Sequence, residues 1–133
     1  MKIMWCKRAK SRGVKENMCS LSHHGIYFFD SDVNNYKMNT YKNCYVGRDT
    51  ENDDIIVVFS NSVRDGANPF TITNRKGRNS WGVSIGCTRF LRDNFNVDGV
   101  RVRRYFERIH DVTVFMNDEL AIRIHMLPED IKK

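Results

Sequence analysis

Two clusters of basic residues are the part of this sequence whose chemistry is easiest to define. The first consists of Arg75, Lys76 and Arg78, which surround Gly77 in a polar stretch. The second lies in residues 101–108, where one glutamate accompanies Arg101, Arg103, Arg104 and Arg108. Guanidinium groups bind phosphate and carboxylate groups through paired hydrogen bonds, so both clusters are suited to a phosphate backbone.

The first cluster is followed by Trp81, which is near enough to act as a stacking surface for a base. Arg101 and Arg103 are two residues apart, a spacing that places both on one face of a β-strand. Simpler interpretations are a solvated hairpin tip for the first cluster and the charged face of an edge strand for the second. The nucleic-acid-binding residues that the sequence predicts are Arg75, Lys76, Arg78, Trp81, Arg101, Arg103 and Arg104.

The sequence lacks the common motifs of enzymes and of metal sites. It contains no G-x-S-x-G, H-E-x-x-H, G-x-x-x-x-G-K-[ST] or G-x-G-x-x-G motif. His110 and Asp111 form a candidate acid–base pair, but no third group is placed to orient them. Cys6 and Cys19 are too far apart for the close pair typical of a zinc site. We therefore expect a protein that is not an enzyme and that needs no metal or other cofactor.

The length of 133 residues and the composition exclude several classes of protein. A hydrophobic content of 41% is too high for a mainly disordered chain, and no apolar run approaches the ~20 residues that span a bilayer. The four cysteines are widely spaced, and the N-terminus lacks the apolar stretch of a secretory signal. We expect one domain in the cytoplasm of a bacterial or other host cell, with reduced thiols and no membrane contact.

The net charge of +6 is distributed unevenly along the chain. Residues 1–24 carry six bases and one acid, residues 25–60 three bases and six acids, and residues 61–133 thirteen bases and nine acids. Such asymmetry bears on partners rather than on fold, because basic segments attract polyanions. The acidic stretch 49–54 could itself imitate phosphates toward a basic protein.

The elements that would position the basic clusters are mostly strands. The aromatic run 26–29 and the alternating stretches 81–86, 100–105 and 120–124 have strand propensity. The run 55–59 is apolar on both faces, which predicts a central strand covered on both sides.

The segments between these strands include three predicted connections and one helix. Residues 30–35 have the composition of a turn, residues 60–68 that of a linker and residues 74–80 that of a hairpin loop. A short helix is predicted at 88–94, because its apolar residues fall on one face. Residues 112–116 alternate in hydropathy and predict one more strand.

Two stretches of the chain follow one template, a short apolar strand, a helix-sized segment and a strand pair. We therefore predict a mainly β (β-rich α+β) domain over residues 25–133, built from two such sub-units at 25–60 and 68–125. A basic N-terminal arm, residues 1–24, precedes it. Two copies of the template in one chain would form a pseudo-dimeric, β-barrel-like domain with one or two short helices.

Residues 81–106, WGVSIGCTRFLRDNFNVDGVRVRRYF, resemble the core of the AbrB/SpoVT-type swapped-hairpin proteins. The matching positions are Val83 and Ile85 in the first strand, Phe90, Leu91 and Arg92 in the helix, Asp98 and Gly99 in the turn, and Val100, Val102 and Tyr105 in the next strand. The resemblance implies an interlocked fold that binds DNA through basic residues near such loops. The chain departs from the pattern because it lacks the proline usual before the helix and because its first copy is acidic.

These observations favour a non-enzymatic nucleic-acid-binding or regulatory protein that contacts phosphates through an arginine-rich face, with DNA and RNA both left open. The alternative is a virus- or mobile-element-encoded interaction protein that inhibits a host nucleic-acid enzyme or defence factor, or that sequesters a nucleotide ligand. The partner is then either a nucleic acid or a nucleic-acid-binding host protein. A structural or assembly subunit is a third possibility, because β-rich domains readily pair strand edges, and a homodimer is also left open.

Overall fold

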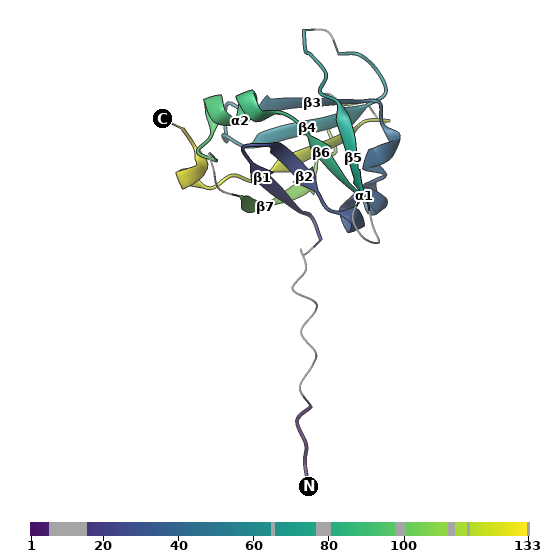
Figure 1. Ribbon diagram of the computed structural model, residues 1–133, viewed down its shortest axis with the longest axis vertical. Coiled ribbons are helices and arrows are strands. Elements are labelled where there is room, and N and C mark those ends of the chain that lie inside the picture. Colours follow the sequence, from purple (N-terminus) through teal and green to yellow (C-terminus); the bar gives the residue numbers. More distant parts are fainter. Residues whose placement is uncertain are drawn as a thin grey trace.

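The computed structural model describes residues 1–5, 16–64, 66–76, 81–97, 101–111, 114–116 and 118–132, without the side chains of Lys76 and Trp81. Short strands make up most of the regular structure in this part of the chain (Figure 1). The elements in chain order are β1 (Met18–Ser22), β2 (Gly25–Phe28), α1 (Asp30–Tyr36), η1 (Met38–Thr40), β3 (Asn43–Arg48), β4 (Ile55–Ser60), β5 (Ile72–Lys76), β6 (Trp81–Ile85), α2 (Thr88–Asn94), β7 (Val102–Arg108), β8 (Leu120–Ile124) and η2 (Pro128–Asp130).

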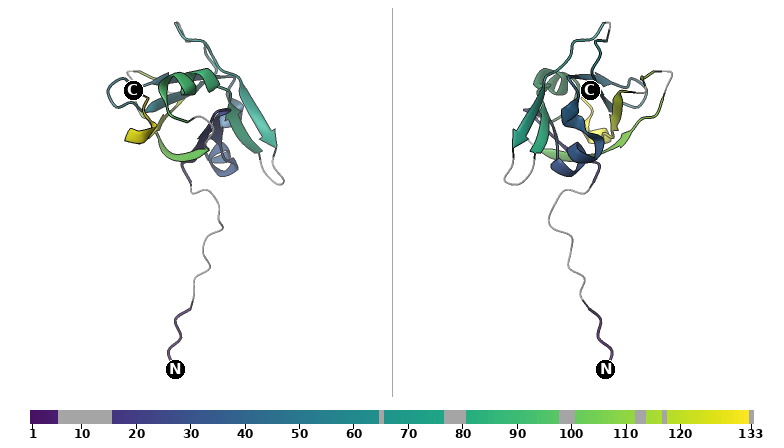
Figure 2. Two further views of the ribbon diagram at one scale, coloured as in Figure 1. Left: turned by 60° about the vertical axis from the view of Figure 1, so that its left-hand side comes forward. Right: turned by 90° about the vertical axis from the view of Figure 1, so that its right-hand side faces the viewer.

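The strands form one antiparallel sheet in the order β3-β4-β8-β7-β1-β2-β6-β5, which curves around a central core (Figure 2). A bridge between Cys44 of β3 and Phe70, two residues before β5, joins the two ends of this order. The Cys44 N–H donates to the Phe70 carbonyl at 3.2 Å, and the Phe70 N–H donates to the Cys44 carbonyl at 2.6 Å. The sheet is therefore a nearly closed barrel, and the predicted β-rich, barrel-like class is confirmed.

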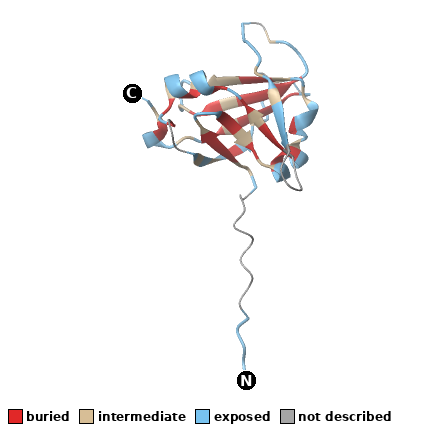
Figure 3. Cartoon of the chain, viewed as in Figure 1, coloured by how far each residue is buried: buried red, intermediate tan, exposed pale blue. Residues whose placement is uncertain are grey.

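The core fills the inside of the barrel, where buried residues recur along the strands (Figure 3). In β4, Ile55, Val57 and Phe59 point inward, whereas Val58 packs against Tyr45 on the outer face. β4 is paired with β3 on one side and with β8 on the other. The prediction of a central strand covered on both faces is confirmed.

The two halves of the barrel share one order of elements. Each half consists of a hairpin, a seven-residue helix and a second hairpin. These are β1-β2, α1 and β3-β4 in the first half, and β5-β6, α2 and β7-β8 in the second. The counterparts are β1 and β5, β2 and β6, β3 and β7, and β4 and β8. If each strand is replaced by its counterpart, every strand keeps equivalent neighbours around the barrel. Each half therefore has one strand more than the predicted strand–helix–strand-pair unit, because a hairpin precedes each helix, and the two halves form a barrel with an internal two-fold relation.

The first strand lies within the segment 1–24, which the sequence predicts as an arm. From Met18 onward this segment belongs to the sheet, where β1 is paired with β2 and β7. Cys19 and Leu21 are fully buried, while Ser20 and Ser22 lie on the other face. Two apolar residues in alternation are too short a pattern to predict a strand. Residues 6–15 lie outside the described residues.

Residues 30–35, predicted as a turn, are helical in α1. Asp30 and Asp32 lie in its first turn, a position where acidic residues are common. Asp, Ser and Asn favour both turns and helix starts, so composition did not separate the two. The helix predicted at 88–94 is confirmed as α2, whereas residues 114–116 form no strand.

Gly25, the first residue of β2, occupies a position that only glycine fits without strain, because of its backbone conformation and a close contact. Its φ is +125°, and an added Cβ would lie 2.0 Å from the Ile85 carbonyl oxygen. We expect Gly25→Ala to lower the free energy of unfolding by about 3 kcal/mol, because backbone atoms would have to move. Urea denaturation followed by circular dichroism measures this change.

Gly47→Ala is the matched control, because a Cβ at Gly47 would meet no atom within 4 Å. Its effect should stay within about 0.5 kcal/mol. Equal stabilities of the two variants would contradict the tight approach of Gly25 to β6.

Candidate nucleic-acid interface

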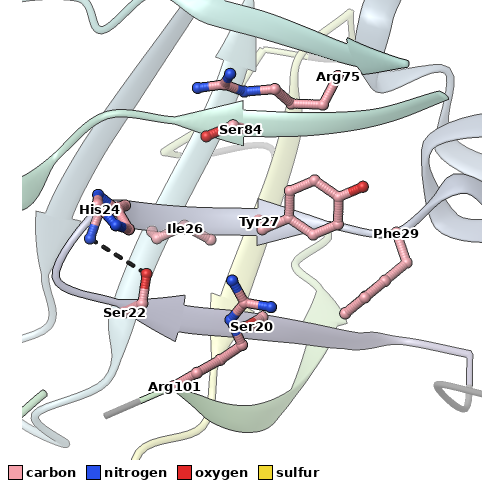
Figure 4. Close-up of a pocket in the computed structure, with 10 residues that line it drawn as sticks. Ser20, Ser22, His24, Ile26, Tyr27, Phe29, Arg75, Ser84 and Arg101 are labelled. Carbon is pink, nitrogen blue, oxygen red and sulfur yellow. Dashed lines mark hydrogen bonds between the residues drawn. The ribbon is translucent and has the colours of Figure 1, made fainter. Parts of the chain in front are cut away.

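A pocket of about 540 Å³ opens on the outer face of the sheet, over β1, β2 and β6 (Figure 4). Its lining combines small residues, a tyrosine, a phenylalanine, a histidine and two arginines, and it includes no acidic residue. The side chains and backbone that form it come from Ser20, Ser22, His24, Gly25, Ile26, Tyr27, Phe29, Arg75, Ser84 and Arg101. Hydroxyl groups, an aromatic surface and positive charge therefore surround a single hollow.

Strand pairing brings these residues together from distant parts of the chain. Tyr27 is paired with Ser20 of β1 on one side and with Ser84 of β6 on the other. Its neighbours Ile26 and Phe28 are fully buried in the core. Because side chains alternate along a strand, Tyr27 and its two serine partners must lie on the outer face.

The ring of Tyr27 lies across the neighbouring strand at Gly82. A Cβ added to Gly82 would lie 2.0 Å from the Tyr27 hydroxyl oxygen and 2.4 Å from Cζ. Phe29 meets the Tyr27 ring edge-on, with 5.1 Å between ring centroids and 85° between ring planes. The Arg103 guanidinium lies over the Phe29 ring, 5.7 Å from its centroid. One glycine thus makes room for the ring, and Phe29 holds it from the side.

Arg75 and Arg101 border the pocket from opposite sides of β2 (Figure 4). Arg75 belongs to β5, Arg101 directly precedes β7, and both residues are exposed. Within the described residues, neither of them forms an ion pair, and Arg103 forms none either. The positive charge at the pocket is therefore available to an anion from solution.

The structure brings three of the predicted residues, Arg75, Arg101 and Arg103, to this outer face. Arg104 points to the opposite face of β7, where it forms an ion pair with Asp130 at 2.5 Å. Its guanidinium is occupied within the fold, and we leave it out of the interface. The side chains of Lys76 and Trp81, and Arg78 as a whole, lie outside the described part of the chain.

Sequence reasoning missed the residues that form the floor and wall of the pocket. They are Ser20, Ser22, Tyr27, Phe29 and Ser84. A signal was present in the stretch 82–86, where Gly82, Ser84 and Gly86 alternate with Val83 and Ile85. A strand whose outer residues are all small leaves space above it, but only the strand order shows that a tyrosine lies alongside.

Other clusters considered in the sequence are occupied within the fold. In the acidic stretch 49–54, Asp53 forms an ion pair with Arg48, and both Asp49 and Asp54 form ion pairs with Arg123. The side-chain hydrogen bond from Arg123 lowers the pKa of Asp49. Three carboxylates of this stretch are therefore engaged, which weakens its interpretation as a phosphate mimic.

The buried thiols do not form a reactive site. Burial raises the pKa of Cys19 and Cys44, and it raises the pKa of Cys87 to about 12. These thiols stay protonated near neutral pH, and a thiolate is the nucleophilic form. In the part of the chain that the structure describes, no group of three His, Cys, Asp or Glu residues could hold a metal ion.

Comparisons with known proteins give no relative: no protein-family model, no curated protein and no solved structure matches the chain. The resemblance of residues 81–106 to the AbrB/SpoVT-type proteins stays a prediction. Within that segment the structure has β6, α2 and β7 in succession. Among the described residues, no helix is long and apolar enough to cross a membrane.

The ion pair of Arg104 and Asp130 generates a prediction about stability. Burial by itself raises the pKa of Asp130, but hydrogen bonds from Arg104 and from the Leu127 N–H outweigh it, so that the pKa lies below its ordinary value. We expect Arg104→Met to lower the free energy of unfolding by roughly 3 kcal/mol at neutral pH, because it leaves a buried carboxylate unpaired.

This loss should shrink as the pH falls below about 4. A carboxyl whose pKa is lowered by folding stabilises the protein above its unfolded-state pKa, and this contribution disappears as the pH falls through the folded-state pKa. Urea denaturation at neutral pH and at about pH 3 tests both statements. Arg103→Met, at the exposed neighbouring position, is the control and should change stability by about 0.5 kcal/mol or less. Equal losses in the two variants would contradict the structural role of Arg104.

Proposed function

We propose that this protein binds nucleic acid, without catalysing a reaction, through the outer face that carries Arg75, Arg101 and Arg103, here called the arginine face. The observation that carries the proposal is the position of Arg75 and Arg101, which border one pocket although 26 positions separate them in the sequence. Neither guanidinium is neutralised by an acidic group of the described residues. Unpaired arginines converging on a hollow are suited to an anionic ligand.

The width of the arginine face supports a polymeric anion. Four strand-to-strand gaps separate β7 from β5, which is roughly 19 Å at about 4.8 Å per gap. Phosphates follow one another every few ångströms along a nucleic-acid strand, so several can lie within this width. A single strand lying across β1, β2 and β6 would therefore meet arginines at both sides.

The contacts around the pocket also suit a nucleic acid better than an acidic protein. Tyr27 and Phe29 offer aromatic surface between the arginines, and the serine hydroxyls offer donors and acceptors. Backbone contacts by arginine combined with aromatic stacking are the usual basis of binding to single strands. The net charge of +6 adds a favourable long-range attraction.

Removing both pocket arginines tests the proposal. We expect Arg75→Ala combined with Arg101→Ala to weaken the binding of a fluorescein-labelled oligonucleotide by about tenfold or more at low salt, because two phosphate contacts are lost. The slope of log affinity against log salt should decrease by about 1–2, since fewer counterions are released. Fluorescence anisotropy over a salt series measures both quantities.

Arg92→Ala combined with Arg108→Ala is the control, because it removes the same charge at two exposed positions that do not line the pocket. It should retain most of the wild-type affinity. Equal weakening by the two double substitutions would show binding by net charge alone and would contradict the proposal. Absence of wild-type binding at low salt would contradict it as well.

A further inference from the structure

We infer that the pocket of the arginine face holds one unpaired nucleotide, with its base stacked on Tyr27 and its phosphates contacted by Arg75 and Arg101. This inference rests on the proposed function and specifies its ligand as a single strand. It combines three observations: an open aromatic face, a hollow of suitable size beside it, and cations on two sides.

The open aromatic face is that of Tyr27. Its ring lies flat across β6 because position 82 is glycine, and Figure 4 shows the ring with one face turned away from the sheet. In Figure 4, Phe29 lies beside the edge of this ring and not over its face, and the two ring planes are 85° apart. The outer face of Tyr27 is thus left for a planar group from solution.

A base reaches such a surface only when it is unpaired and unstacked. In a duplex the faces of the bases are covered by neighbouring bases, and a protein meets only base edges and the backbone. Aromatic side chains on a sheet are instead a common platform for the bases of single strands. The pocket volume of about 540 Å³ lies within the range of small-molecule sites, so a nucleotide unit is a suitable occupant.

The floor of the pocket indicates little preference among bases. Ser20, Ser22 and Ser84 contribute hydroxyls, and a hydroxyl can donate or accept according to its rotation. The Ser22 hydroxyl oxygen accepts a hydrogen bond from the backbone N–H of His24 at 3.2 Å, which leaves the hydroxyl proton free to donate to a ligand. Such a floor can pair with the edge of different bases, whereas fixed donors would select one.

The test compares ligands that differ in one property each. The probe is a fluorescein-labelled oligothymidylate of about ten nucleotides, measured beside an abasic strand with the same number of phosphates and a duplex of the same length. Binding of thymidine monophosphate is measured separately by isothermal titration calorimetry, so that it is detected whether or not an oligonucleotide binds. We expect the base-bearing strand to bind about tenfold or more tightly than the abasic strand, since stacking is lost without the base.

Variants at Tyr27 assign this difference to the pocket. Tyr27→Leu should weaken binding of the oligothymidylate about tenfold, leave binding of the abasic strand unchanged and keep the salt slope, because the phosphate contacts remain. Tyr27→Phe retains the stacking ring and should bind as the wild type does. Gly82→Ala keeps the tyrosine but displaces its ring, so it should resemble Tyr27→Leu.

The outcomes separate this inference from the proposed function. Equal affinity for the base-bearing and abasic strands, or a duplex that binds as well as the single strand, would overturn the nucleotide pocket and leave nucleic-acid binding in place. Binding of thymidine monophosphate, sensitive to Tyr27→Leu, without binding of any oligonucleotide would support the pocket and overturn the proposed function. No binding of any of these ligands would overturn both.

Discussion

The register between β2 and β6 is the constraint on which both the barrel and the pocket depend. These strands join the two halves of the chain, and the pairs Ile26–Ile85 and Phe28–Val83 place four core residues inside the barrel. A shift by one residue would turn these apolar side chains toward solvent and move Tyr27 into the core. The burial of the four residues therefore also fixes the outward position of Tyr27, and with it the pocket.

The pocket is the place where the internal two-fold relation is broken by side chains. Phe28 in β2 and Ile85 in β6 are each the last inward residue before the helix of their half. If these two residues occupy equivalent positions in the two halves, Tyr27 is the counterpart of Ser84. The same two residues are paired with each other, so the two-fold axis passes between them. A large residue in one half and a small one in the other leave space beside an aromatic ring. A strictly symmetric pair of tyrosines would fill that space, and a pair of serines would offer no stacking surface.

Local patterns in the sequence predicted much of the sheet. Alternation or apolar runs indicated β4, β6, β7 and β8, and one-sided apolar spacing indicated α2, because these patterns extend over five or more residues. They did not indicate β1, which is held in the sheet by pairing with two other strands: Cys19 is opposite Phe28 of β2 on one side and Arg104 of β7 on the other. The pocket also requires the strand order, since Ser20 and Arg101 are neighbours only through the pairing of β1 with β7. No local pattern encodes contacts between such distant segments.

The arginines of this protein fall into two groups that sequence alone separates only in part. One group forms ion pairs with carboxylates of the fold and consists of Arg48, Arg64, Arg104 and Arg123. Burial alone would raise the pKa of Glu119 and of Asp130, but the hydrogen bonds from their arginine partners lower both pKa values. Arg103 and Arg104 show the division most clearly, because they are adjacent and face opposite sides of β7. The alternation with Val102 is enough to place Arg104 on the apolar face of β7. It does not reveal the ion pair, because the carboxylate partner Asp130 lies 26 positions further along the chain.

The division also supports the proposal that the arginine face binds an external anion, although the protein is only moderately basic. An arginine already paired within the fold would have to give up a short hydrogen bond before it could contact a phosphate, and that exchange gains little. Arg75, Arg101 and Arg103 have no such partner among the described residues, so a phosphate need not displace a carboxylate from them. The proposed nucleic-acid interface therefore rests on the position of the unpaired charges more than on the net charge of +6.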